Sequence, residues 1–320
     1  MSSNDPEVTN HSSSPFVVIV VLTWNDTQMT IECLESVFDS DYPNFKVVLV
    51  DNGSEEPCGE ILKARFEDVE LLVLPENRGF TGGSNAGLER GIELGGEYIH
   101  LIGNDSTLAT NTVSELVRVL IDDKTLALAS PLVWEVTPPG EAKKVAFYYA
   151  DIDRARATHR HYIDASIPYD SRSWPVRVCD FVPFIAAMFR REALEDVGLF
   201  DESLSTCWED YDLCIRFSDA GWLIATGGDS IVVHKGSMTT GSVSPYITYL
   251  TTRNRLICLF RYASLGQIVR NTPYLLRSFY WQVKKYGFKN WSCHKAFFMG
   301  VMDFIMGVRG VGRAPIDRNG

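Results

Sequence analysis

The stretch Phe16-Val17-Val18-Ile19-Val20-Val21-Leu22-Thr23 is an unbroken apolar run rich in β-branched residues. Such a run is typical of a strand that is buried on both faces of a parallel sheet. Directly after it, Asp26 or Thr27 can cap a helix, and apolar residues recur at helical spacing up to Phe38. The chain therefore begins with a predicted strand and helix, the first unit of an α/β fold.

Further apolar runs of strand length follow along the chain. We expect them to form strands at residues 45–50, 71–74, 98–102 and 126–133. A glycine-rich stretch at residues 79–87 opens another predicted helix. This alternation of strands and helices implies right-handed crossovers and a doubly wound, mostly parallel sheet.

Polar side chains follow four of the predicted strands, at the point where each strand ends. They are Asn25, Asp51, Arg78 and Asp105. Each also has an ordinary structural explanation, since Asp51 begins an Asp-Asn-Gly turn signal and Asp105 can cap a helix. The carboxyl ends of parallel strands share one edge of the sheet, where ligands bind, so four such residues together indicate a binding site.

A dinucleotide-binding fold is the obvious competitor, but the sequence lacks its fingerprint. That fingerprint needs Gly-x-Gly-x-x-Gly after the first strand, whereas Thr23-Trp24-Asn25-Asp26 contains no glycine. Gly82 and Gly83 follow the third strand without the required spacing, and the sequence has no Walker lysine motif. We therefore expect any nucleotide to be bound by side chains.

An acidic segment, Cys207-Trp208-Glu209-Asp210-Tyr211-Asp212-Leu213-Cys214-Ile215-Arg216, has the pattern of a helix start. Helical spacing places three apolar residues on the inward side, namely Leu213, Cys214 and Phe217. It leaves Glu209 and Asp210 in the first turn, where free N–H groups stabilise negative charge. We expect Asp212 and Arg216 to form an i,i+4 ion pair. A carboxylate held beside the preceding tryptophan is suited to act as a general base next to a sugar ring.

Length and cysteine content limit the class of protein. The 320 residues can bury a sizeable core, and one large domain plus an appendage fits. The seven cysteines include no Cys-x-x-Cys pair, so we expect a reducing compartment and neither a disulfide framework nor a zinc ribbon. Residues 1–14 are polar and lack the basic and apolar regions of a signal peptide, which predicts a disordered leader.

Charge is unevenly distributed along the chain. Residues 251–320 carry 12 Lys and Arg against 2 Asp and Glu, a balance of +10, whereas the remainder has a balance of −21. Basic and aromatic residues in this tail predict amphipathic helices. Such helices lie at an anionic membrane surface or cap the main domain, and the sequence leaves both open. We expect no nucleic-acid partner, because the body is acidic and has no nucleic-acid-binding motif.

Three of the six histidines fall between residue 134 and residue 250. His159 and His161 fall in residues 134–178, where the strand and helix signals weaken. We interpret this segment as one that leaves the sheet and passes over the crevice at the carboxyl edge, where ligands are expected. We expect both to face solvent, because the sequence identifies no partner for them. His234 ends the β-branched run Ile231-Val232-Val233, which can return this histidine to the crevice.

Several stretches match one family in its own order, over about residues 16–262. They are Val20-Val21-Leu22-Thr23-Trp24-Asn25, Val50-Asp51-Asn52-Gly53-Ser54, Glu76-Asn77-Arg78-Gly79-Phe80 with Gly83-Ser84-Asn85-Ala86-Gly87, Gly103-Asn104-Asp105-Ser106, Gly198-Leu199-Phe200-Asp201-Glu202, the stretch from Trp208 to Arg216, His234-Lys235-Gly236-Ser237, and Arg253-Asn254-Arg255. With these motifs the chain resembles glycosyltransferase family 2, inverting enzymes of the GT-A fold, and within it the rhamnosyltransferase-like branch. The resemblance implies a Rossmann-like, doubly wound GT-A catalytic domain in residues 15–250, followed by a basic amphipathic helical tail in residues 251–320.

The resemblance also implies a site for a UDP- or dTDP-linked sugar donor. Asp51 would recognise the base of the nucleotide, with Arg78 nearby. Thr23, Asn25 and Asn104 would lie on the same donor side.

A metal site is implied next to the donor. Asp105 would be the last acid of an Asp-x-Asp metal motif, whose first position is Gly103 in this chain. His234 would help to bind the metal or the diphosphate. Oxygen ligands plus one imidazole suit Mg²⁺ or Mn²⁺.

Catalysis is implied at the acidic segment. Asp210 would be the catalytic base, with Glu209 as the other candidate, and Trp208, Arg190 and Arg191 would lie on the acceptor side. The Gln-x-x-Arg-Trp motif of processive synthases is absent, which favours transfer of a single sugar.

The implied function is that of a hexosyl- or deoxyhexosyltransferase. Its acceptor would be a hydroxyl of a lipid-linked or cell-surface polysaccharide. We expect a cytoplasmic protein that is peripheral at the inner face of the cell membrane through its tail. The alternative is a non-catalytic nucleotide- or glycan-binding protein of the same fold.

Overall fold

The computed structural model describes residues 14–56, 58–136, 144–162, 174–235, 244–286 and 290–312. Its first half alternates strands and helices, as the apolar runs predict. The elements are β1 (Val17–Thr23), α1 (Thr27–Phe38), β2 (Phe45–Asp51), α2 (Cys58–Arg65), β3 (Glu70–Val73), α3 (Gly79–Glu93), β4 (Tyr98–Gly103), β5 (Ser106–Leu108), α4 (Thr112–Asp122) and β6 (Leu126–Glu135).

The second half adds shorter strands, which complete the sheet, and the C-terminal helices. These elements are β7 (Lys144–Phe147), β8 (Tyr149–Asp153), β9 (Thr158–Tyr162), β10 (Arg177–Cys179), β11 (Ala186–Arg190), α5 (Arg191–Val197), α6 (Glu209–Asp219), β12 (Leu223–His234), α7 (Pro245–Tyr262), α8 (Leu265–Tyr286) and α9 (Trp291–Ile305). Strand β12 joins two apolar runs across a register shift between Thr226 and Ile231.

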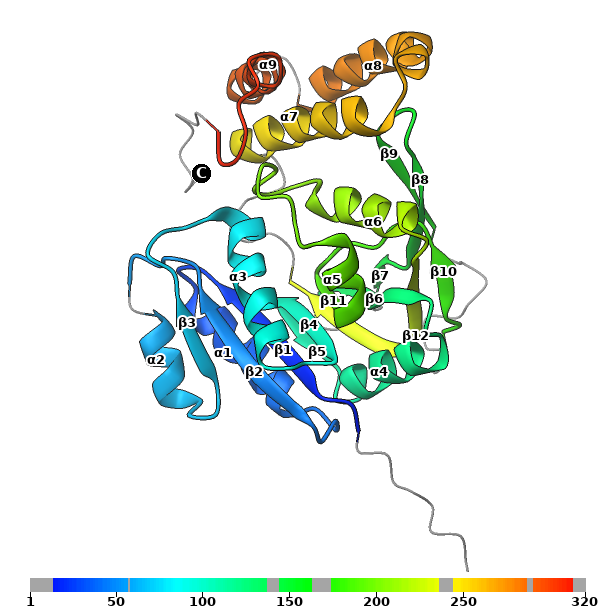
Figure 1. Cartoon of the computed structure of the whole chain (residues 1–320). Coiled ribbons are helices and arrows are strands. Elements are labelled where there is room, and N and C mark those ends of the chain that lie inside the picture. Colours follow the sequence, from blue (N-terminus) through cyan, green and yellow to red (C-terminus); the bar gives the residue numbers. More distant parts are fainter. Residues whose placement is uncertain are drawn as a thin grey trace, which may run out of the picture.

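One large mixed sheet forms the body of the protein (Figure 1). Its strands run in the order β10-β12-β6-β11-β4-β1-β2-β3, with β5 paired to β12 and β7 paired to β6. Strands β4, β1, β2 and β3 are parallel to one another, as are β6 and β12. Strand β11 is antiparallel to both neighbours, β4 and β6. The predicted α/β fold with a mostly parallel central sheet is therefore confirmed.

The opening strand is buried as its sequence predicts. Val17 to Val21 are fully buried in β1, and residues 47–50 of β2 are at most 1% exposed. Helix α3 packs tightly on these two strands, because a Cβ atom at Gly87 would lie 2.2 Å from Val20 Cγ1 and 3.0 Å from Val50 Cγ2. The glycine-rich stretch is thus needed for close packing of a helix on the sheet.

The C-terminal helices gather at one end of the molecule, beyond α6 (Figure 1). Helix α7 begins at Pro245, so the expected boundary at residue 251 falls inside a continuous helix. Helix α9 packs on α7 through a narrow face of buried residues, Cys293, Ala296, Gly300 and Asp303. Within the described ranges, no helix has the length and apolar character needed to cross a membrane. The predicted leader falls outside the described residues, except for Ser14.

Candidate active site

Helix α6 places two acids side by side in its first turn, as predicted. Glu209 is 9% exposed, and its Oε2 atom has no hydrogen-bond partner among the described residues. Asp210 Oδ1 accepts a hydrogen bond of 2.7 Å from the Tyr211 amide. Burial raises the pKa of both carboxyl groups, and the neighbouring Asp210 charge raises the pKa of Glu209 further. A carboxylate with a raised pKa is a stronger proton acceptor than an exposed one, which suits a general base.

The residues that lead into α6 have an unusual backbone. Ser205, Cys207 and Trp208 have φ angles of 62°, 67° and 74°, in the left-handed region that non-glycine residues rarely occupy. Such conformations cost roughly 1–3 kcal/mol each and persist only where surrounding contacts hold them. We call residues 205–208 the approach loop, because it determines where the two acids point.

Aromatic rings surround the approach loop on the side of the β8–β9 hairpin. The Trp208 ring centre lies 4.9 Å from that of Tyr211 and 6.4 Å from that of His159. His159 also stacks on Phe181 at 4.4 Å and on His161 at 4.7 Å. Phe181 and Tyr211 are buried, so Trp208 and the two histidines form the accessible part of this aromatic cluster, which is of a kind that suits the flat face of a sugar.

The histidines of this hairpin differ from each other in environment. His161 is exposed, as expected, whereas His159 is only partly exposed and its Nδ1 atom is buried. Burial lowers the pKa of His159 to about 4, so its ring is neutral at physiological pH. No local pattern predicts this placement, because a two-stranded hairpin carries His159 to a helix about 50 residues further along the chain.

Asp105 and His234 meet at the sheet edge, as the sequence predicts. Strand β12 runs antiparallel to β5, which brings His234 Nε2 to 3.0 Å from Asp105 Oδ2. Both side chains are about a quarter exposed. The first position of the implied Asp-x-Asp motif is Gly103. A Cβ atom there would lie 2.9 Å from Asp105 Oδ1, so a side chain at this position would crowd the carboxylate.

These two side chains fit a divalent ion that is completed by other ligands. One carboxylate oxygen and one imidazole nitrogen are acceptable to Mg²⁺ or Mn²⁺, and such ions usually take their remaining ligands from phosphate oxygens and water. In the part of the chain that the structure describes, no group of three or more His, Cys, Asp or Glu is arranged to hold a metal. Asp105 and His234 alone are therefore suited to a site that forms together with the donor diphosphate.

The predicted donor-side residues also gather at the carboxyl edge of the sheet. Thr23 pairs with Asp51 in the β1–β2 register, and the neighbouring Leu22 pairs with Gly103 of β4. Asn104 therefore follows directly at this edge, and its Nδ2 lies 3.4 Å from Thr23 Oγ1. The parallel register of β1, β2 and β4 brings the ends that precede Asn25, Asp51 and Asp105 to one edge, as expected, whereas contacts of these residues with a nucleotide stay a prediction.

Several donor-side groups already make hydrogen bonds within the protein. Asp51 is 4% exposed, and its carboxylate accepts bonds of 3.0 Å from the amides of Ser54 and Gly59. Asn25 Oδ1 accepts from the Glu55 amide at 2.8 Å. The two bonds to Asp51 hold its carboxylate at the start of α2. The Asn25 side chain is exposed although its oxygen accepts a hydrogen bond.

Arg78 is placed at the N-terminus of α3 and is engaged by an acid. Its Nη2 donates to both carboxylate oxygens of Glu202, at 3.0 Å each. Both side chains are about two-fifths exposed. A nucleotide contact by Arg78 would compete with this ion pair.

The expectation that Arg190 and Arg191 lie on the acceptor side is wrong. Strand β11 is antiparallel to β4, so Arg190 pairs with Tyr98, at the amino end of β4 and opposite to Asp105. The Arg190 guanidinium is buried there and donates to the carbonyl oxygen of Leu126 at 2.8 Å. Arg191 begins α5 at the same end of the sheet. The sequence indicates a strand at these residues but not its direction.

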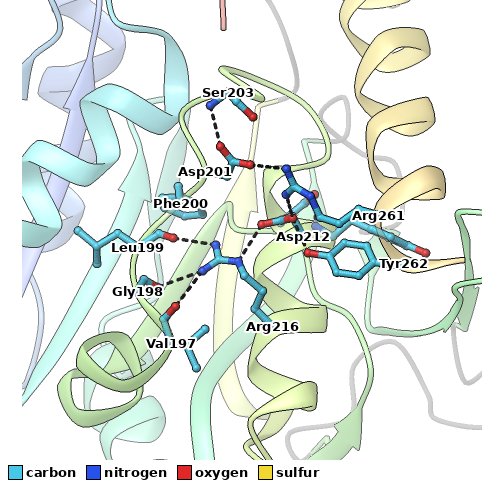
Figure 2. Close-up of polar contacts among 12 residues, drawn as sticks. Val197, Gly198, Leu199, Phe200, Asp201, Ser203, Asp212, Arg216, Arg261 and Tyr262 are labelled. Atoms are coloured by element: carbon cyan, nitrogen blue, oxygen red, sulfur yellow. Dashed lines mark hydrogen bonds and ion pairs between the residues drawn. The ribbon is translucent and has the colours of Figure 1, made fainter. Parts of the chain in front are cut away.

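A buried polar network fixes the far side of α6 (Figure 2). The predicted pair of Asp212 and Arg216 is confirmed, with Arg216 Nε 2.8 Å from Asp212 Oδ2. Asp212 is fully buried and also accepts bonds of 2.5 Å from Arg261 and Tyr262 at the end of α7. Arg261 in turn bonds Asp201 at 2.7 Å. Two basic residues therefore join α6 to α7 and to the loop before α6.

Comparison with known proteins agrees with this geometry. The family described as Glycosyl transferase family 2 matches residues 18–198. The glycosyltransferase GlyG of Streptococcus pneumoniae is 32% identical over 108 residues, which is 33% of this chain and 35% of that protein. The dTDP-rhamnosyl transferase RfbF of Shigella flexneri is 24% identical over 221 residues, 68% of each protein. Among the first relatives, the chain covers about a third of GlyG and 15% of the pneumococcal GlyA.

Solved structures support the fold at lower identity. The structure of S. aureus TarS 1–349 in complex with UDP-GlcNAc has a TM-score of 0.57 and 18% identity, and covers 92% of this chain and 81% of that one. The structure of GalNAc-T7 with UDP, GalNAc and Mn²⁺ has a TM-score of 0.60 and 15% identity, and covers 78% and 48%. Since the family match extends over more than half of the 320 residues, this chain belongs to glycosyl transferase family 2.

Proposed function

We propose that the protein is an inverting glycosyltransferase. It moves one sugar, a hexose or a deoxyhexose, from a UDP- or dTDP-linked donor to a hydroxyl of a lipid-linked or cell-surface glycan. The observation that carries this proposal is the pair of a buried Glu209 and a partly buried Asp210, held in the first turn of α6 beside the Trp208 ring. A raised carboxyl pKa next to an aromatic surface favours proton abstraction from a sugar hydroxyl.

The chemistry takes place in one displacement. The acceptor oxygen attacks the anomeric carbon while the bond from that carbon to the diphosphate oxygen breaks, and the diphosphate leaves with the bonding electrons. Asp210 takes the proton of the acceptor hydroxyl as the new bond forms. Attack from the face opposite the leaving group inverts the anomeric configuration.

Glu209 is better suited to tune Asp210 than to replace it. Its Oε2 is buried with no hydrogen-bond partner among the described residues, and its pKa is raised above the usual range. A Glu209 side chain that stays protonated at neutral pH adds no second charge next to Asp210, so the two acids do not compete for one proton.

Asp105 and His234 are the residues that would hold Mg²⁺ or Mn²⁺. A divalent ion bound there would offset the charge of the leaving diphosphate as a Lewis acid. The crystallisation of GalNAc-T7 with UDP and Mn²⁺ supports this choice of cofactor.

The donor is expected along the edge formed by Thr23, Asn25, Asp51 and Asn104, with Arg78 at its rim. The dTDP-rhamnosyl transferase RfbF and the TarS complex with UDP-GlcNAc support a UDP- or dTDP-linked sugar. Asp51 is the residue for base recognition, since it ends β2 at the carboxyl edge.

The acceptor is expected at the aromatic surface of Trp208 and His159. Because Arg190 and Arg191 lie at the opposite edge of the sheet, they are not part of this side. His159 is neutral at physiological pH, so this surface recognises a sugar through ring contact more than through charge.

Attachment to the inner face of the cell membrane belongs to the same proposal. Helix α9 exposes apolar side chains on the side away from α7, with Trp291 74%, Met302 52% and Ile305 67% exposed. An amphipathic helix with such a face, in a tail of balance +10, suits the interface of an anionic membrane. A peripheral cytoplasmic protein would reach a lipid-linked acceptor there.

The second candidate is a non-catalytic nucleotide-binding protein. It is favoured by one observation, the glycine at position 103 where a second metal-binding acid would stand. The two candidates differ in turnover and not in binding.

A donor screen tests the proposal. The full chain is incubated with UDP- and dTDP-linked sugars and Mn²⁺, and release of free nucleotide is measured with and without bacterial lipid extract as acceptor. We expect release with one donor class, and none from the Asp210→Asn variant. Thermal stabilisation by nucleotide without release in any combination would favour the non-catalytic protein instead.

A further inference from the structure

Helix α7 carries a motif, Arg253-Asn254-Arg255, that the proposed reaction leaves without a role. Asn254 is completely buried. Its Nδ2 atom lies 2.7, 2.9 and 2.8 Å from the carbonyl oxygens of Leu204, Thr206 and Cys207. An amide nitrogen has two hydrogens, so this group is shared among three acceptors. One side chain of α7 thus binds the backbone of the approach loop at Thr206 and Cys207, and that of Leu204 directly before it.

The approach loop needs such contacts in order to keep its conformation. Three of its four residues, Ser205, Cys207 and Trp208, are left-handed without being glycine. At roughly 1–3 kcal/mol each, their combined strain favours relaxation of the loop unless other interactions oppose it. Because Trp208 is also the N-cap of α6, relaxation of its backbone would reorient the first turn of the helix and the acids in it.

Helix α3 contacts the same loop from the other side. The Thr81 amide donates to the Ser205 carbonyl oxygen at 2.9 Å, and the Phe80 amide donates to Thr206 Oγ1 at 3.3 Å. Gly79 permits this close approach, since a Cβ atom there would lie 2.3 Å from Ser205 Oγ. The carbonyl oxygens of residues 204–207 therefore all accept hydrogen bonds, three of them from Asn254.

The orientation of the Asn254 amide is itself fixed. Its Oδ1 accepts a bond of 3.0 Å from Arg253 Nε. The Arg253 guanidinium is fully buried and donates to the Gly310 carbonyl oxygen at 2.6 Å and to Tyr249 Oη at 3.3 Å. Tyr249 donates onward to Asp303 of α9 at 2.7 Å. Since only donors stand on the Arg253 side, the NH₂ group must point to the loop.

We propose that Asn254 is a positioning residue for the Glu209–Asp210 pair: it holds the approach loop in its left-handed conformation and so fixes the position of both carboxyl groups in the first turn of α6. This inference rests on the proposed function of that pair. Three thiols lie close enough to interact with the pair electrostatically, those of Cys207, Cys214 and Cys258. Burial raises the pKa of each thiol, so they remain neutral and the pair itself dominates the local titration.

Two readouts that need no substrate test the inference. The Asn254→Leu variant keeps the size of the side chain but removes its donors. The control is Thr252→Val on the same helix, because Thr252 is also buried but bonds only Thr248 of its own helix. Hydrogen exchange of residues 203–212 should accelerate about tenfold or more in Asn254→Leu, as expected for losing one or two buried hydrogen bonds, and stay unchanged in Thr252→Val.

The second readout is a mutant cycle with Glu209→Gln. In the wild-type background, this substitution should raise the melting temperature at mildly alkaline pH by several degrees, because a buried charge is removed. In the Asn254→Leu background, the released loop hydrates the pair, so the gain should fall to less than half.

Either of two results would overturn the inference: exchange that rises equally across α7 and the loop, or an equal gain from Glu209→Gln in both backgrounds. Absence of sugar transfer from every donor would contradict the proposed function, yet both readouts would still report on the loop. The failure of one proposal is therefore distinguishable from the failure of the other.

Discussion

At the scale of single residues, Asp210 and Glu209 are adjacent, yet we expect them to have different roles. Neighbouring residues in a helix point about 100° apart, so both cannot face the same anomeric carbon. Asp210→Asn should lower kcat by roughly 10²–10⁴-fold while donor affinity changes little, because the amide cannot accept the proton. Parallel kinetics of Glu209→Gln provide the control. If Glu209→Gln abolished transfer while Asp210→Asn kept a nearly normal kcat, the catalytic base would be Glu209 and not Asp210.

The pH dependence of transfer follows from the same burial. The base must be deprotonated, and burial raises the pKa of Asp210 above that of an exposed aspartate. The acid limb of kcat should therefore lie at higher pH than an ordinary aspartate would place it, with activity lost as the pH falls through that limb. A rate profile from mildly acidic to alkaline pH measures its position. A limb at the usual aspartate range would show that the base is solvent-exposed in the working enzyme.

The stability of the free protein should change with pH in the opposite direction. Folding raises the pKa of Glu209, so the folded state binds its proton more tightly than the unfolded chain does. The contribution of this protonated carboxyl group to the free energy of unfolding is fully present below the pKa that Glu209 has in the unfolded chain. It is lost as the pH rises through the higher pKa of Glu209 in the folded protein.

Asp105 carries the expected metal-dependent step of donor binding. Its carboxylate is the one acid of the Gly103-Asn104-Asp105 motif, and it lies 3.0 Å from His234. Asp105→Ala should remove the effect of Mn²⁺ on the binding of UDP or dTDP, measured by calorimetry, while the fold is kept. Asp123→Ala is the control, since the Asp123 carboxylate accepts hydrogen bonds from Thr125 in the turn after α4, away from this edge. Unchanged Mn²⁺-dependent binding in Asp105→Ala would exclude this role.

At the scale of elements, α6 depends on a charge network that its first turn does not reveal. Asp212 is fully buried between Arg216 and Arg261. Removing one member of a buried ion network leaves the others unpaired, so Asp212→Ala should lower the free energy of unfolding by roughly 3–5 kcal/mol. Urea denaturation measures this loss.

A matched control lies on the same helix. Asp219 pairs with Arg154 at 2.5 Å, but its side chain is 53% exposed. An exposed pair contributes about 0–1 kcal/mol, so Asp219→Ala should have little effect. Equal losses in the two variants would show that burial of Asp212 is not the cause.

Some of the basic residues in the C-terminal tail make hydrogen bonds to the rest of the protein. Three of its 12 basic residues lie in α7 and bond the catalytic body: Arg253, Arg255 and Arg261. These residues cannot serve a membrane at the same time. Helix α7 is therefore packed as part of the domain, whereas α9 presents an apolar face outward.

At the scale of the whole molecule, the exposed face of α9 predicts where a membrane would bind. Replacing Trp291 and Ile305 together by serine should reduce co-sedimentation with anionic vesicles several-fold, because both side chains are largely exposed and would leave water on insertion. Ile61→Ser with Val73→Ser is the control, since these exposed apolar residues lie on α2 and β3. Equal loss in both pairs, or none in either, would contradict a role of α9.

What the sequence determined by itself is the set of local features. The apolar runs predict the strands of the parallel core, because full burial leaves a continuous hydrophobic pattern that needs no knowledge of the neighbours. Polar residues that follow parallel strands must share an edge, so Asn25, Asp51 and Asp105 could be placed together in advance. The acids of α6, with the Asp212–Arg216 pair behind them, likewise follow from helical spacing.

Only the tertiary structure decided the features that depend on distant partners. The direction of β11 comes from its pairing with β4 and β6, and it moves Arg190 to the opposite edge from the one expected. The left-handed approach loop depends on Asn254, about 50 residues later in the chain. Strand direction, backbone strain and the burial of a polar side chain are set by contacts between segments far apart in sequence, and these contacts have no local periodicity from which they could be inferred.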